Sequence, residues 1–152
     1  MLTPTGPQLI EYNCRFGDPE CQVLLLRLES DLAEMLLACA ENRLSTIAPP
    51  RFSADAALTV VLAAQGYPDT PVKGGPIGPL DPATASGARV FHAGTAMNGE
   101  QLVAHGGRVL SVTARGPSVS AAQAAAYAAV DLIDFPQGFC RRDIGWREIA
   151  RE

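Results

Sequence analysis

The chain has 152 residues, of which 47% are hydrophobic and 18% charged, and its formal net charge is −4. This length suits one domain, or one domain and a fragment. The acidic balance excludes the broad basic surface that binds nucleic acids or anionic membranes, so we expect neither partner. No apolar run reaches the roughly 20 residues of a transmembrane helix and no secretory signal is visible, so we expect a cytoplasmic protein.

The four cysteines stand at positions 14, 21, 39 and 140. Their spacing contains no CxxC pair and matches neither a zinc finger nor a disulfide framework. We therefore expect reduced thiols, as in other proteins of a reducing compartment. Cys14 is expected to pack against apolar neighbours.

The stretch with most chemical information lies near the amino terminus, where residues 11–20 read EYNCRFGDPE. An apolar lead-in predicts a strand, whose side chains alternate between two faces. Glu11, Asn13 and Arg15 then share one face. Glutamate and asparagine oxygens suit Mg²⁺, which usually binds through one or two protein groups and nucleotide phosphates. From the residues alone, this face is either a metal site or a solvated strand surface.

Two helices are predicted after this strand. The first begins with Asp18 as its N-cap, and a proline and a glutamate follow in its first turn. The second begins at Asp31, with Glu34 three residues later as in a capping box. Its predicted buried stripe comprises Leu32, Leu36, Leu37 and Ala40. Residues 44–53, which include two adjacent prolines, are expected to form a linker.

Beyond the linker the pattern is typical of strands. Residues 57–64 and 89–93 predict two strands, separated by a long loop rich in glycine and proline. Residues 101–104 and 108–114 predict a hairpin that turns at residues 105–107. Strands combined with the following helix indicate a small α+β unit.

An alanine-rich helix is predicted near the carboxyl end. Ser120 and Gln123 form its expected capping box, and it is expected to run to about Ile133. Its predicted inward face comprises Ala126, Val130 and Ile133. One last helical turn is expected near the end of the chain, with Trp146 as a packing anchor. The charged residues Arg141, Arg142, Asp143 and Arg147 predict either a solvated or interdomain ion-pair network, which we favour, or a basic patch that faces another domain or a ligand.

The stretch at residues 11–20 resembles the hallmark of the phosphoribosylamine–glycine ligase family, also called glycinamide ribonucleotide synthetase. Further motifs agree with that family in order and approximate spacing. They are GYP at 66–68, VFHAGT at 90–95, GGRVL at 106–110, VTA at 112–114 and FCRRDIGWR at 139–147. The similarity covers nearly the whole chain, although Cys21 stands where the family usually has threonine.

The resemblance implies an ATP-grasp ligase of purine synthesis. Enzymes of this family use ATP to activate glycine as glycyl phosphate. They then couple it to 5-phosphoribosylamine, which gives glycinamide ribonucleotide. Family members are much longer than this chain. The implied fold is α+β, with residues 1–45 as the terminal strand and helices of the ATP-grasp domain and residues 46–152 as the small α+β carboxy-terminal domain. The missing amino-terminal domains of the ligase are the implied partners.

The resemblance also implies roles for particular residues. Glu11 and Asn13 correspond to ligands of Mg²⁺ or Mn²⁺ that bridge the ATP phosphates. Arg15 either holds a substrate carboxylate or phosphate, or pairs with Asp18 or Glu20. Asp18 is first an N-cap and second a contact for the glycine amine. No catalytic residue is assigned.

Two functions remain open from the sequence. The chain is a segment of an active ligase, or it is a noncatalytic truncated product or interaction module that keeps the fold without the activity. In both cases we expect the isolated chain to make no glycinamide ribonucleotide.

Overall fold

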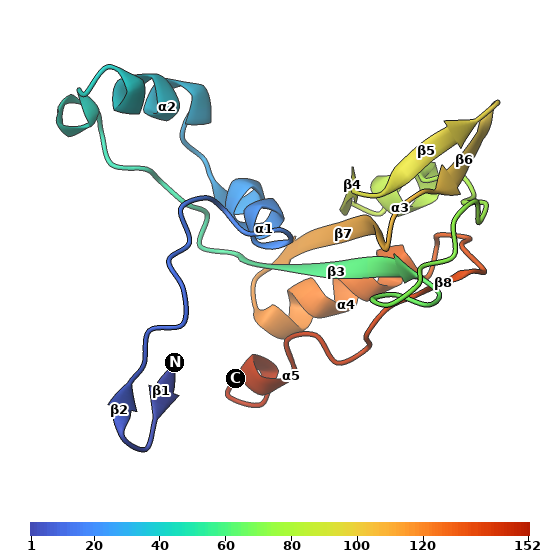
Figure 1. Cartoon of the computed structure of the whole chain (residues 1–152). Helices are drawn as coiled ribbons and strands as arrows, with labels where there is room; N and C mark the ends of the chain where they lie inside the picture. Colours follow the sequence, from blue (N-terminus) through green and yellow to red (C-terminus); the bar gives the residue numbers. More distant parts are fainter.

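The computed structural model describes residues 1–152 and shows a folded body from which an amino-terminal arm and a helix extend (Figure 1). The body is built on an antiparallel sheet with strand order β4-β7-β3-β8. The two central strands, β3 (Ala56–Ala64) and β7 (Arg108–Gly116), pair along most of their length. The short strands β4 (Arg89–His92) and β8 (Gly138–Phe139) flank them. The strands predicted at 57–64 and 89–93 are thus confirmed.

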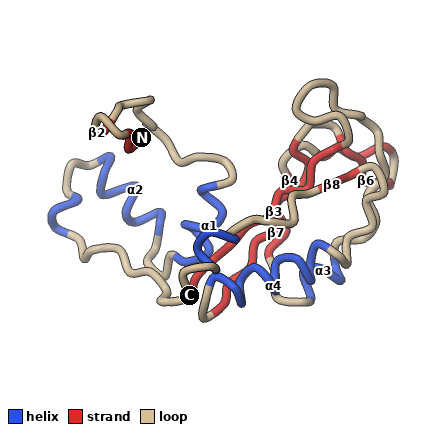
Figure 2. The backbone as a smooth tube through the Cα atoms, turned by 90° about the horizontal axis from the view of Figure 1, so that it is seen from below, coloured by secondary structure: helices blue, strands red, loops and turns tan.

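Helix α4 (Val119–Val130) covers one face of the sheet and forms the core with it (Figure 2). Because side chains alternate along a strand, Leu58, Val60 and Leu62 of β3 belong to the same buried cluster as the core side of α4. Three alanines of α4 are completely buried, and their small size lets the helix approach the sheet closely: Ala122, Ala126 and Ala129.

The start and end of α4 differ from the prediction. The N-cap is Ser118, not Ser120, and its hydroxyl accepts a hydrogen bond from the Ala121 amide at 3.1 Å. Ser118 has the extended backbone that an N-cap requires, whereas Ser120 already lies within the helix. Gln123 does not complete a capping box, because its Nε2 donates to the Ile144 carbonyl at 2.6 Å. The helix ends at Val130, short of the predicted end.

The predicted hairpin between residues 101–104 and 108–114 is wrong. Strand β6 (Gln101–Ala104) pairs instead with β5 (Thr95–Asn98), which the sequence analysis did not predict. Asn98 pairs with Gln101, so the two-residue turn is Gly99-Glu100, and Gly99 takes a positive φ of 61°, as the first residue of a two-residue hairpin turn with glycine there requires. Helix α3 (Asp81–Ala85), inside the predicted long loop, was also not predicted.

The amino-terminal region contains a small hairpin, an extended arm and two helices. Strands β1 (Leu2–Thr3) and β2 (Gly6–Pro7) form the hairpin, and α1 (Glu20–Arg27) contacts β3 and β7. Helix α2 (Leu32–Ala40) stands away from the body and is followed by the 3-10 turn η1 (Leu44–Thr46), as Figures 1 and 2 both show.

The strand predicted over the EYNCRFGDPE segment is wrong. Residues 8–17 form an arm without regular secondary structure that bends at Arg15, Asp18 lies in a turn, and no strand pairs with this segment. Cys14, which was expected to pack, is therefore exposed, and so is its neighbour Tyr12, at 86%.

The N-cap of α2 is confirmed, and its buried stripe is not. The Asp31 carboxylate accepts hydrogen bonds from the amides of Ala33 and Glu34, at 2.8 and 3.2 Å. Ala38 is the buried residue of the helix, whereas Leu36 and Leu37 remain 57% and 52% exposed. No element of the chain covers the face that carries these two leucines, so the apolar pattern finds no partner.

The last helical turn is α5 (Trp146–Ile149), as predicted. Trp146 is not a packing anchor, since it is 54% exposed with the Arg147 guanidinium 5.2 Å from its ring centre. Ion pairs form in this segment as predicted, between Arg141 and Asp143 at 2.7 Å, and Arg142 pairs at 2.6 Å with Asp131, a partner that was not predicted. None of the helices combines the length and apolar character that a bilayer crossing requires.

Candidate functional site

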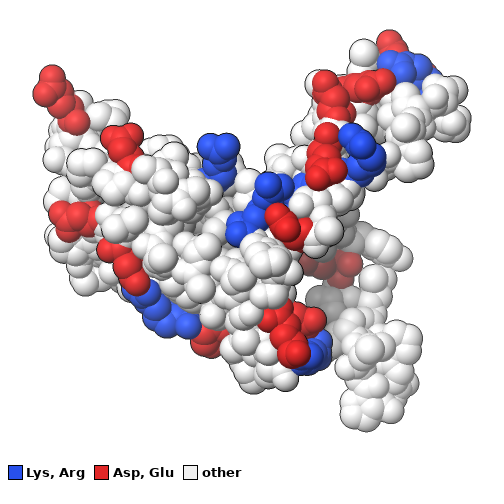
Figure 3. Space-filling view, turned by 180° about the vertical axis from the view of Figure 1, so that it is seen from behind, with Lys and Arg blue, Asp and Glu red and all other residues white.

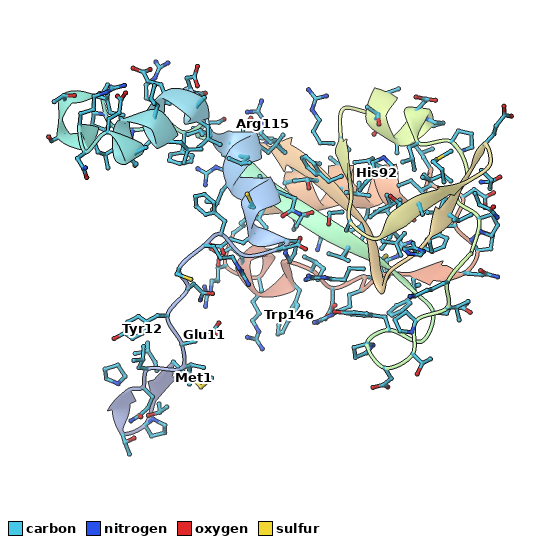
Figure 4. All side chains as sticks on the ribbon, turned by 45° about the horizontal axis from the view of Figure 1, so that its top comes forward. Met1, Glu11, Tyr12, His92, Arg115 and Trp146 are labelled. Carbon is cyan, nitrogen blue, oxygen red and sulfur yellow. The ribbon has the colours of Figure 1, made fainter.

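The arm presents Glu11 and Asn13 on the same side, as their spacing predicts. Asn13 Nδ2 donates to Glu11 Oε1 at 3.3 Å, and both side chains are exposed. Figure 4 shows Glu11 and Tyr12 pointing to opposite sides of the arm, as expected for an extended backbone. The two candidate metal ligands are therefore neighbours that are open to a second molecule.

Arg15 forms neither of the ion pairs considered from the sequence. Its Nη1 donates to the neighbouring Phe16 carbonyl at 3.1 Å, and no ion pair with Asp18 or Glu20 is present. Glu20 Oε2 instead accepts a hydrogen bond of 2.8 Å from the Gly17 amide. The guanidinium of Arg15 is thus exposed and without a carboxylate partner inside the chain.

Asp18 is not the N-cap of α1. The helix begins at Glu20 and no side chain caps it. The Asp18 carboxylate instead accepts from two side chains, Gln22 Nε2 at 2.8 Å on Oδ1 and Arg108 Nη2 at 3.1 Å on Oδ2. Arg108 Nη1 also donates to the Asp18 main-chain carbonyl, at 2.7 Å. The turn before α1 is therefore fixed from the body rather than by a helix cap.

Gly17 is the tightest point of this turn. A Cβ atom built at this position would lie 2.6 Å from Glu20 Oε2, closer than real Cβ contacts come. The Gly17 carbonyl accepts from the Cys21 amide at 2.8 Å, which extends the helical bonding back to the turn. A side chain at this position would therefore have to displace the Glu20 carboxylate from the Gly17 amide.

A cavity of about 660 Å³ lies beside this turn, between α1 and the sheet face that α4 does not cover. Its floor is β3, and ten of its fifteen lining residues are hydrophobic. Polar groups at its lining include Glu20, Arg108 and Arg141. Burial raises the pKa of the Cys140 thiol, which also lines the cavity, so this sulfur stays protonated near neutral pH and is a poor nucleophile.

No other part of the chain adds metal ligands to the arm. The structure contains no group of three or more His, Cys, Asp and Glu side chains that could hold an ion. His92 hydrogen-bonds with Thr95 Oγ1 at 3.0 Å, and Figure 4 shows it far from Glu11. On the face seen in Figure 3, acidic and basic side chains are interspersed. The candidate metal ligands at the arm are thus Glu11 and Asn13.

Sequence reasoning missed Arg108. Ninety residues separate it from Asp18, so no local pattern connects the two. The available signal was its place in the GGRVL motif, where an arginine follows two glycines at the start of a predicted strand.

The comparisons with known proteins give one family. Residues 57–147 match the family described as "Phosphoribosylglycinamide synthetase, C domain". The chain belongs to this family. The match covers the whole β3–α4 body and ends within α5, and so includes the sheet beside the cavity.

Curated relatives of this phosphoribosylglycinamide synthetase domain extend the similarity to the arm. A phosphoribosylamine–glycine ligase of Mesorhizobium japonicum is 58% identical over 152 residues, which is 100% of this chain and 36% of the relative. The chloroplastic ligase of Arabidopsis thaliana is 51% identical and is matched over 96% of this chain and 28% of its own length. The chain therefore spans about a third of these relatives.

A solved structure shows the same fold. The crystal structure of phosphoribosylamine–glycine ligase from Thermotoga maritima aligns with a TM-score of 0.72 and 33% sequence identity. The alignment covers 94% of this chain and 34% of that one. The α+β fold of this chain is thus that of the carboxy-terminal part of such a ligase.

Proposed function

We propose that this chain is the carboxy-terminal part of a phosphoribosylamine–glycine ligase. In that role it takes part in ATP-dependent ligation of glycine to 5-phosphoribosylamine, which gives glycinamide ribonucleotide. The observation that carries the proposal is the similarity over the full chain to about a third of such a ligase. The rest of the enzyme, its amino-terminal domains, is the main partner.

The proposed division places the terminal part of an ATP-grasp domain at residues 1–45 and the carboxy-terminal domain at residues 46–152. The family match, residues 57–147, falls inside the second unit. The first unit leaves many large apolar side chains exposed, among them Leu9, Tyr12 and Leu36. Apolar surface of this extent is typical of a face that another domain covers.

Glu11 and Asn13 are proposed to hold Mg²⁺ or Mn²⁺. The donor set fits, because a carboxylate and an amide oxygen are hard ligands and Mg²⁺ accepts a small protein contribution when phosphates supply the rest. A half-turn of the Asn13 amide brings its oxygen to the side where Nδ2 now meets Glu11. When bound, such a cation neutralises charge that develops on the transferred phosphoryl group.

Arg15 and Asp18 are proposed as substrate contacts. The exposed guanidinium of Arg15 has no carboxylate partner in the chain, so its bidentate fork is available to a substrate carboxylate or phosphate. Asp18 keeps free lone pairs beside its two internal donors, and these can accept from the amine of glycine. Both residues act as binding groups and neither breaks or forms a bond.

A noncatalytic interaction module is the second candidate. The exposed apolar side chains of the arm and α2 favour binding to another protein, and binding of this kind needs no chemistry. Combining this chain with an amino-terminal ligase fragment distinguishes the two functions. Only the ligase function predicts that glycinamide ribonucleotide then forms.

The deciding experiment joins the amino-terminal two thirds of the Mesorhizobium japonicum ligase to this chain. We expect the chimera to form glycinamide ribonucleotide from ATP, glycine and 5-phosphoribosylamine, and the 152-residue chain alone to form none. A chimera that folds and binds ATP without making product favours the noncatalytic module.

Glu11→Gln in the same chimera tests the metal assignment. Removal of the negative oxygen should lower kcat by at least about a hundredfold, the scale found when one charge-stabilising group is lost. The folded state should be unaffected, since the side chain is exposed on the arm. Glu100→Gln, a change at an exposed glutamate of the β5–β6 turn, is the matched control. Unchanged turnover and metal dependence in the Glu11 variant would exclude Glu11 as a ligand.

A further inference from the structure

One ion pair connects the amino-terminal unit to the body. Of the six ion pairs in the structure, only that between Asp18 and Arg108 joins residues 1–45 to residues 46–152. Arg108 Nη1 also donates a hydrogen bond to the Asp18 carbonyl. One guanidinium therefore binds both the main chain and the side chain of Asp18. Such a planar two-point contact fixes direction as well as distance.

Arg108 is itself held by the body. It opens β7 directly after Gly107, whose carbonyl accepts from the Ala64 amide of β3 at 2.8 Å. A Cβ atom at Gly107 would lie 2.4 Å from the Tyr67 ring, and one at Gly94 would lie 2.6 Å from the Arg108 carbonyl. The Tyr67 ring thus packs against Gly107 and the Gly94 backbone against the Arg108 carbonyl, so the main chain from which the Arg108 side chain extends is closely packed.

The ion pair between Asp18 and Arg108 is too exposed to contribute much to stability. The side chains of Arg108 and Asp18 are 40% and 51% exposed. Ion pairs this open to water contribute little to the free energy of unfolding. A contact that stabilises little but fixes two atoms of a proposed substrate residue points to a geometric role.

We propose that Arg108 is a positioning residue for glycine binding, acting through Asp18. This proposal rests on the proposed function above and adds to it a residue that lies outside the EYNCRFGDPE segment. Arg108 holds the Asp18 carboxylate in the orientation that accepts the glycine amine, and it anchors the turn from which the arm with Glu11 and Arg15 departs. Gln22 supports the same carboxylate from α1, through Oδ1.

Steady-state kinetics of Arg108→Ala in the chimera tests this role. Loss of the orienting contact should raise the KM for glycine about tenfold, with kcat and the KM for ATP within about twofold of the parent. The KM for glycine of Arg108→Lys should lie between those of the parent and of Arg108→Ala, because an ammonium group cannot bind the Asp18 carbonyl and carboxylate together. The cavity beside Arg108 gives access to the vacated space, so added guanidinium ion should partly restore the KM for glycine. Arg89→Ala, a change at an exposed arginine of β4, is the control.

A second measurement needs no turnover and uses the 152-residue chain. Arg108→Ala should accelerate hydrogen exchange at the Gly17 and Cys21 amides while the β7 amides keep their rates. An unchanged KM for glycine in an active chimera overturns the proposal, and so does unchanged exchange at Gly17 and Cys21. An inactive parent chimera counts instead against the proposed function, and the exchange measurement then still tests whether Arg108 anchors the turn at Asp18.

Discussion

At the scale of single residues, Glu152 shows how a side chain near the end of the chain stabilises α4. Its carboxylate accepts from the Val119 and Ser120 amides, at 2.6 and 3.3 Å. These amides belong to the first turn of α4 and have no partner within the helix. The hydrogen bond with Ser120, followed by those with the amides, lowers the pKa of Glu152 below its usual 4.5. A negative charge there also suits the helix dipole.

The pH dependence follows from the sign of that shift. Because the pKa of Glu152 is lower in the folded chain than in the unfolded one, its stabilisation is complete above about pH 4.5 and is lost as the pH falls through the folded pKa. Glu152→Gln should therefore lower the Tm at pH 7 and make the Tm less sensitive to acid between pH 5 and pH 3. Thermal unfolding followed by circular dichroism measures both. Equal acid sensitivity in the two proteins would contradict the cap, and Glu148→Gln in α5 serves as control.

Single residues also show how far sequence reasoning reaches. The common side of Glu11 and Asn13 could be predicted because an extended backbone alternates its side chains whether or not it joins a sheet. The ion pair of Asp18 could not, because its partner Arg108 is distant in sequence and comes near only when β7 has formed. Residue types near position 18 predicted that Asp18 caps the helix, whereas in the folded chain its carboxylate binds Arg108.

At the scale of elements, β3 and β7 determine the stability of the body. Leu110 of β7 is completely buried and faces Leu62 of β3 across the sheet. Leu110→Ala should reduce the free energy of unfolding by about 2–5 kcal/mol, the cost of lost burial and a residual cavity. Urea denaturation measures the difference. Leu132→Ala, at a leucine that is 49% exposed, should change it by less than about 0.5 kcal/mol. Similar losses in both variants would contradict the assigned core.

The elements that the sequence predicted well share a clear cause. Strand β3 is an apolar run with β-branched residues, and α4 has a continuous alanine-rich face that meets it. Pairing was predicted less well. The partner of β6 depended on the Gly99-Glu100 turn and not on Gly106-Gly107, where the Gly106 amide donates to the Gly94 carbonyl. Apolar periodicity identifies strands, but turn chemistry and tertiary packing decide which of them pair.

At the scale of the whole molecule, α2 has an apolar face without a partner. Leu36 and Leu37 are exposed in this chain, so replacing both with alanine should alter its free energy of unfolding by less than about 0.5 kcal/mol. In the chimera the same double change should lower the Tm, because the added domains are expected to cover these leucines. Differential scanning calorimetry of both proteins makes the comparison. An unchanged Tm in the chimera would place the amino-terminal domains elsewhere.

The half-exposed contact of Asp18 with Arg108 has a physical consequence for the proposed glycine site. Dissolved ions screen charges that are open to water, and the screening length falls from about 10 Å at 0.1 M salt to about 3 Å at 1 M. The only ionic link between the arm and the body is of this open kind. Ionic strength thus becomes an external control on how firmly the proposed glycine site is aligned, and on its affinity.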